Sequence, residues 1–104
     1  MPVDGLRGHL DLIVLAVLAD GPAHGYALVE ELRARSGGVF ELPEGSVYPA
    51  LYRLEAAGLL SSTWQAASGR RRRIYRLTRA GRRKLAEGRR EWRQFADTMS
   101  EVVA

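Results

Sequence analysis

The sequence predicts a mostly α fold with a minor β component (α+β): a winged helix-turn-helix followed by a long C-terminal helix of the dimerisation type. Three observations predict it. Apolar residues recur at helical spacing in three segments of the first half of the chain. Two alternating segments joined by a basic, glycine-containing loop follow them. A long amphipathic segment ends the chain, and 104 residues are enough for one small domain only.

The first two helices are expected over Leu6–Ala19 and Gly25–Arg35. The first contains the apolar residues Leu6, Leu10, Ile13, Val14, Val17 and Leu18. Gly21-Pro22 ends this helix, because proline cannot continue it. Ser36-Gly37-Gly38 ends the second helix. We expect His24 to cap the start of the second helix or to pack against it.

A third helix is expected from Ser46, its predicted N-cap, to about Ala57, after a connection over Val39–Gly45. Gly58 closes it. Pro49 lies in the first turn, where its missing N–H would have no intrahelical partner. The predicted buried stripe comprises Val47, Leu51 and Leu54, and the side chains off that stripe include Tyr48, Tyr52, Arg53 and Glu55.

A β-hairpin is expected after Gly58. Leu59–Gln65 reads as one strand and Arg72–Thr78 as the other, since its side chains alternate in character. Residues 66–71 between them are small, flexible and then basic, which is typical of a hairpin loop.

The last helix is expected over Arg79–Val103, with Thr78 as its cap. Its apolar residues follow a heptad: Leu85, Trp92 and Met99 are seven apart, and so are Phe95 and Val102. Such a helix is longer than so small a domain needs for itself, so we expect it to pair with a second copy in a homodimer. We include Leu6 and Leu10 in that interface. The alternative is packing onto the first helix within one chain, and the two contacts are compatible.

Charge is unevenly distributed along the chain. Residues 1–69 hold four Arg against eight acidic residues, whereas residues 70–104 hold twelve Lys or Arg against four. Such a basic surface predicts a polyanionic partner, although a solvated helix face is an alternative. There is no cysteine, so no disulfide, thiolate nucleophile or zinc finger is expected. The apolar run Leu12–Ala19 is too short to span a bilayer, and we expect a cytoplasmic protein without membrane contact.

Polar and aromatic residues on the third helix are suited to base edges in the major groove of double-stranded DNA. They are Ser46, Tyr48, Pro49 and Tyr52, with Arg53 on the flank. The hairpin residues Arg70–Arg73 can lie on the phosphate backbone or enter the minor groove. Residues 1–78 would then be the DNA-binding domain and 79–104 the dimerisation helix of the same compact unit. Alternatively, the tyrosines cover the core and the arginines form a solvated turn.

Three motifs resemble the PadR family of bacterial transcriptional regulators, specifically its short subfamily with one C-terminal helix. They are His24-Gly25-Tyr26-Ala27-Leu28, the segment from Gly45 to Leu59 that contains Tyr48-Pro49, and Tyr75-Arg76-Leu77-Thr78-Arg79-Ala80-Gly81. The resemblance implies a homodimeric repressor that binds a pseudo-palindromic operator and is released by a small aromatic or drug-like ligand. It places Tyr26, Ser46, Val47, Tyr48, Pro49 and Arg53 near DNA, and the arginines of the hairpin, which is the wing of this fold, on phosphates.

The resemblance also implies an effector pocket between the C-terminal helix and the first helix, with Trp92 and Phe95 facing Leu12 or Leu15. The alternative is that Trp92 only anchors the dimer. No cofactor or metal ion is expected, because two histidines are too few for an ordinary site. The chain carries no catalytic constellation, so we do not expect an enzyme. The competing function is a protein–protein adaptor or an RNA-binding module without operator recognition.

Overall fold

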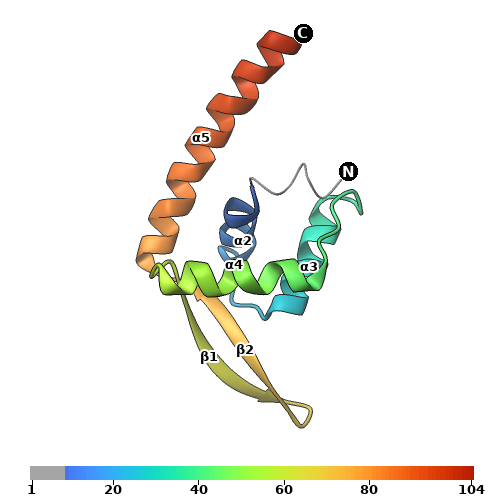
Figure 1. The fold of residues 1–104 in the computed structure, drawn as a ribbon, viewed down its shortest axis with the longest axis vertical. Coiled ribbons are helices and arrows are strands. Elements are labelled where there is room, and N and C mark those ends of the chain that lie inside the picture. Colours follow the sequence, from blue (N-terminus) through green and yellow to red (C-terminus); the bar gives the residue numbers. More distant parts are fainter. Residues whose placement is uncertain (1–8) are drawn as a thin grey trace.

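The computed structural model describes residues 9–104 and contains four helices and one hairpin within that range (Figure 1). The elements are α2 (Leu10–Leu18), α3 (Gly25–Arg35), α4 (Glu44–Ala56), β1 (Leu60–Ala67), β2 (Arg70–Leu77) and α5 (Arg79–Val103). The predicted order of three helices, a hairpin wing and a long C-terminal helix is therefore confirmed. Leu6, predicted to start the first helix and to lie in a dimer interface, falls outside the described residues.

The first three helices enclose one hydrophobic core, with α3 and α4 forming the helix-turn-helix (Figure 1). Helix α4 runs across the lower ends of α2 and α3, and the hairpin hangs below it. The largest fully buried side chains come from α2, α3, α4 and β2: Tyr75, Leu18, Leu28, Leu51, Val14 and Val47. The core therefore fixes the position of the hairpin as well as that of the helices.

The hairpin reaches further than the sequence predicted. Its antiparallel strands pair from Leu60↔Leu77 to Ala67↔Arg70 and are joined by Ser68 and Gly69 alone. Both turn residues have positive φ, 51° and 76°, as the tight two-residue hairpin turns of type I′ require. The prediction of a loop over residues 66–71 was wrong, because Arg70 and Arg71 are strand residues with fixed faces.

Helix α4 begins two residues before the predicted N-cap. Its N-cap is Pro43, and the backbone N–H of Ser46 donates to the Pro43 carbonyl at 2.9 Å. The Ser46 hydroxyl donates to the same carbonyl at 2.7 Å, so it is not a capping acceptor and the prediction was wrong. The predicted role of Gly58 is confirmed: it has φ of 79°, and the Leu59 N–H reaches back to the Leu54 carbonyl at 3.0 Å.

Helix α5 starts at the predicted cap and then leaves the body of the domain (Figure 1). The Thr78 hydroxyl accepts from the Gly81 N–H at 3.0 Å and donates to the Gly58 carbonyl at 2.7 Å. Leu85 is only 3% exposed within one chain. The prediction that Leu85 lies in a dimer interface was therefore wrong, since its side chain is already covered by its own core. Leu10 is partly buried against the same core.

Gly81 sets how closely α5 approaches the segment that follows α4. A Cβ at this position would overlap the backbone carbonyl oxygen of Leu59, and backbone yields less easily than a side chain. We predict that Gly81→Ala lowers the free energy of unfolding by about 1–3 kcal/mol, the range for overpacking. Gly45→Ala is the matched control, because nothing lies within 4 Å of its added Cβ. It should be neutral or stabilising by up to about 1 kcal/mol. Urea denaturation measures both, and equal effects would contradict the prediction.

Candidate nucleic-acid interface

A groove of about 700 Å³ lies between the start of α3, helix α4 and the hairpin. Aromatic rings and guanidinium groups form its walls. Its lining residues are His24, Gly25, Tyr26, Tyr48, Tyr52, Trp64, Arg70, Arg71, Arg72, Arg73 and Tyr75. The structure thus brings together seven of the eleven residues predicted to bind DNA, and a groove of this kind suits a polyanion.

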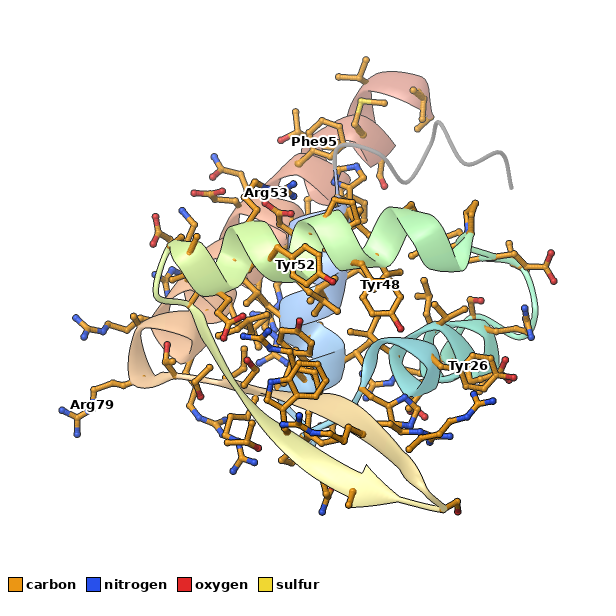
Figure 2. All side chains as sticks on the ribbon, turned by 60° about the horizontal axis from the view of Figure 1, so that its bottom comes forward. Tyr26, Tyr48, Tyr52, Arg53, Arg79 and Phe95 are labelled. Carbon is orange, nitrogen blue, oxygen red and sulfur yellow. The ribbon has the colours of Figure 1, made fainter. Side chains whose placement is uncertain are left out.

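Tyr48 and Tyr52 project from the same side of α4, toward α3 and the hairpin (Figure 2). They are four residues apart, and their ring centroids are 6.3 Å apart. Tyr48 packs directly on Gly25, where an added Cβ would lie 2.8 Å from the ring. An alanine here would force the Tyr48 ring to move, so glycine lets α3 and α4 approach this closely with the ring in place. Tyr26 is exposed on α3, and its ring stacks on that of His24 with the ring centroids 6.4 Å apart.

The other predicted residues of α4 lie outside the groove. Pro49 and Arg53 are exposed, and in Figure 2 Arg53 lies on the other side of the α4 ribbon from Tyr48. The Arg53 guanidinium forms an ion pair with Asp11 of α2. Ser46 is half-buried. Val47 is 0% exposed, so its predicted position at the DNA was wrong: the buried stripe that includes Val47 is part of the core.

The four wing arginines have different surroundings. Arg70 is exposed at the tip of the hairpin. The guanidinium of Arg71 lies 4.9 Å from the ring centroid of Trp64. Arg72 Nη1 lies 3.1 Å from His24 Nε2, and Arg73 reaches Glu55 of α4 at 3.4 Å. Arg70, Arg71 and Arg72 thus have no acidic partner among the ion pairs of the described residues.

Three residues that shape this groove were not predicted from the sequence: Trp64, Gly25 and Glu55. A tryptophan in a strand is usually a core residue, so its pattern alone does not indicate a surface role. Gly25 looks like an ordinary helix-start glycine until Tyr48 is seen against it. The contact of Glu55 with β2 joins residues 18 positions apart, which local spacing does not reveal.

A second cavity, of about 330 Å³, lies between α2 and α5. Its walls include the four residues predicted for an effector pocket: Leu12, Leu15, Trp92 and Phe95. The rings of Trp92 and Phe95 are 5.9 Å apart, and His9 meets Trp92 edge-on at 5.1 Å. Asp11 and Glu91 add acidic groups to the wall, and Lys84 adds a basic one.

Residues 9–104 contain no cluster of three or more His, Cys, Asp or Glu placed to hold a metal ion. Across the same range, none of the helices combines the length and the apolar character needed to cross a membrane.

The model of the transcriptional regulator PadR-like family matches residues 14–87 of the chain. A transcriptional regulator of Mycobacterium tuberculosis is 43% identical over 90 residues, which cover 86% of this chain and 81% of that protein.

Solved structures agree with this match. A PadR family transcriptional regulator from Eggerthella lenta has a TM-score of 0.85 at 34% identity, covering 97% of this chain and 87% of that one. A transcriptional regulator from Clostridium thermocellum has a TM-score of 0.90 at 27% identity and covers 100% and 99%. Bacillus subtilis PadR in complex with operator DNA shares the fold, with a TM-score of 0.70 at 22% identity over 79% of this chain and 46% of that one.

His24 gives the start of α3 a dependence on pH. Its Nδ1 accepts a hydrogen bond from the Ala27 N–H at 3.2 Å, which confirms the predicted cap and requires a neutral ring. Burial, and then the charge of Arg72, lower the pKa of His24 below its ordinary value of 6.5. The unfolded chain therefore binds the proton more readily than the folded one. The stability that the neutral ring provides is complete above pH 6.5 and is lost as pH falls through the lowered pKa.

We predict that the melting temperature falls between about pH 7 and pH 5, and that it falls less in His24→Asn, because asparagine caps a helix without titrating in that range. Calorimetry at a series of pH values measures this difference. An identical pH dependence in both proteins would mean that the cap does not contribute.

Proposed function

Because the chain belongs to the PadR-like family of transcriptional regulators, we propose that it is a sequence-specific repressor that binds double-stranded DNA as a homodimer and responds to a small ligand. The family consists of transcriptional regulators, so the chain is not an enzyme. The observation that carries the proposal is the groove in which Tyr48 and Tyr52 of α4 face the arginines of the wing. Its site of action is then the cytoplasm, where bacterial DNA lies.

Recognition of DNA divides between helix α4 and the wing. Helix α4 presents an exposed stripe that includes Gly45, Pro49 and Tyr52. In this proposal α4 is the recognition helix, and its early turns enter the major groove. The wing arginines Arg70, Arg71 and Arg72 meet the phosphate backbone beside it, which fixes position but carries no sequence information. Base contacts from α4 then supply the specificity.

The exposed face of α5 supports the homodimer. Beyond Leu85 the helix keeps its apolar stripe, and these side chains lie in the open: Trp92, Phe95, Met99 and Val102. Phe95 is 53% exposed, and a contiguous apolar stripe of this kind is typical of an interaction surface. A second copy of α5 offers the same stripe, and heptad spacing lets the two interlock. A two-fold dimer would match a pseudo-palindromic operator.

The cavity between α2 and α5 supports the ligand response. Its volume of about 330 Å³ lies at the lower end of the range for small-molecule sites. Trp92 and Phe95 offer flat rings to an aromatic ligand, and Leu12 and Leu15 offer an apolar floor. Gly88 contributes room, because a Cβ there would lie 2.8 Å from a Leu12 methyl group. We therefore propose a small aromatic or drug-like effector.

One ion pair leads from this cavity to the DNA-binding helix. Asp11 lines the cavity and pairs with Arg53 of α4. A ligand that draws Asp11 toward itself would release Arg53, and a ligand that leaves Asp11 in place would not. The effect on DNA affinity could not exceed the difference between the ligand's affinities for the two arrangements.

Selection of bound duplexes from a random pool, followed by sequencing, tests the proposed function. We expect an enriched inverted repeat whose half-sites are about one helical turn, 10–10.5 base pairs, or a multiple of it apart. A parallel selection from random RNA is the control. Enrichment of RNA without any duplex motif, or no enrichment in either pool, would contradict operator recognition.

Trp92→Ala tests the homodimer and the cavity together. We predict that dimer dissociation becomes more favourable by about 2 kcal/mol or more, because a tryptophan at an interface centre is a typical hot spot. Sedimentation over a concentration series measures it. Gln94→Ala is the control. Gln94 is exposed on another face of α5, so its replacement should leave association unchanged. Loss of binding to planar aromatic dyes with unchanged association would make Trp92 a cavity wall only, and no change in either would reject both roles.

A further inference from the structure

We propose that Trp64 is a positioning residue of the DNA interface: its ring holds Arg71 of the wing in place, and Arg73 fixes that ring to the recognition helix through Glu55. The inference rests on the proposed DNA-binding function. It assigns a role to a residue that neither the helical pattern nor the basic tip of the hairpin indicates.

Trp64 is an unusual surface residue. It is 55% exposed although it lies in the middle of β1. Its register partner is Arg73, and Arg71 is the next residue of β2 on the same face of the hairpin. Exposing the apolar area of an indole ring to water is unfavourable. The two arginines cover part of that area.

Both guanidinium groups lie within cation–π distance of the ring. The Cζ of Arg71 is 4.9 Å from the ring centroid, and the Cζ of Arg73 is 5.4 Å from it, inside the limit of about 6 Å. A free arginine on a hairpin samples many rotamers and loses that freedom when it binds a phosphate. Stacking on Trp64 restricts Arg71 before DNA arrives, so less entropy is lost on binding.

Arg73 has a different role, because its other contacts are inside the protein. Its Nε donates to the Ser62 hydroxyl at 2.7 Å, and the same hydroxyl donates to Glu55 at 2.5 Å. Arg73 also contacts the Glu55 carboxylate at 3.4 Å. Glu55 belongs to α4, so these bonds connect the recognition helix to the wing. The charge of Arg73 is offset within the chain, whereas Arg71 has no acidic partner among the ion pairs that the described residues form.

These contacts form a continuous series from α4 to the groove: Glu55, Arg73, Trp64 and then Arg71. Each neighbouring pair is in contact. The position of Arg71 relative to α4 is therefore set by the protein and not by the DNA. Direct stacking of Trp64 on a base or a sugar is the alternative, and it predicts a different result in the experiment below.

A double-mutant cycle tests the proposal with a random-sequence 20-base-pair duplex as probe, which needs no known operator. Trp64→Leu should weaken binding about two- to fivefold, the effect of one exposed cation–π contact. It should also reduce the slope of log K against log salt toward that of Arg71→Ala, which loses about 0.9 for one phosphate. Trp64→Leu should have no further effect in the Arg71→Ala background, because the two residues act as one unit. Trp64→Phe keeps a ring face and should bind within about twofold of the unsubstituted chain.

Arg76→Ala is the matched control. Arg76 lies on the opposite face of β2, with Thr63 as its hydrogen-bond partner at 3.5 Å. Arg76→Ala removes one positive charge, as Arg71→Ala does. Trp64→Leu should nevertheless keep its full effect on DNA binding in the Arg76→Ala background. Equal effects of Trp64→Leu with and without Arg71 would overturn the proposal and favour direct stacking on DNA. A Phe variant as weak as the Leu variant would overturn it too.

A measurement without DNA separates this proposal from the proposed function. The chain has two tryptophans, so in a Trp92→Phe background the tryptophan fluorescence comes from Trp64 alone. We expect Arg71→Ala to increase quenching by acrylamide, because the guanidinium no longer covers the ring, and Arg76→Ala to leave it unchanged. Unchanged quenching in Arg71→Ala would overturn the positioning role. Increased quenching in a protein that binds no duplex would instead contradict the proposed function.

Discussion

The burial of Tyr75 is the constraint on which the geometry of the groove depends. Tyr75 is the largest fully buried side chain among residues 9–104 and lies in β2. Its backbone exchanges two hydrogen bonds with Ala23, at 2.9 and 3.0 Å, in the connection between α2 and α3. One residue thus ties the wing to the core through its side chain and to the start of α3 through its backbone. Because that burial removes the hydroxyl from water, it also raises the pKa of Tyr75.

The alternation of β2 explains why cations lie beside the tyrosines of α4. Arg71, Arg73, Tyr75 and Leu77 share one face of the strand, since side chains of the same parity point the same way. Tyr75 and Leu77 are buried, and Arg71 is exposed. The face that packs on the core therefore continues beyond the edge of the core as a charged face. Rigid packing at one end of the strand orients the arginines at the other end.

The sequence predicted the elements well where a period determines them and less well where a single contact does. The helices, the hairpin and the Thr78 cap follow from spacing and capping residues. The start of α4 does not, because the Ser46 hydroxyl bonds to the Pro43 carbonyl instead of capping. Val47 shows the limit of a resemblance: its own apolar spacing indicated the core, and the structure agrees with the spacing. Trp64 acquires its surroundings only from the strand register, which a strand pattern alone does not specify.

The heptad of α5 combines two kinds of burial that a sequence cannot separate. Leu85 and Trp92 are one heptad apart, yet Leu85 is covered by its own chain and Trp92 is exposed. The change occurs where α5 leaves the domain, and the cavity lined by Gly88, Leu12 and Trp92 lies at that junction. A ligand there would contact both the core-bound part of α5 and the part proposed to pair with a second copy. Binding at this junction would therefore act on the angle between the domain and the partner proposed for it, and that angle would set the spacing of the two recognition helices. Since DNA half-sites have a fixed spacing, a small change in that angle would be enough to alter affinity.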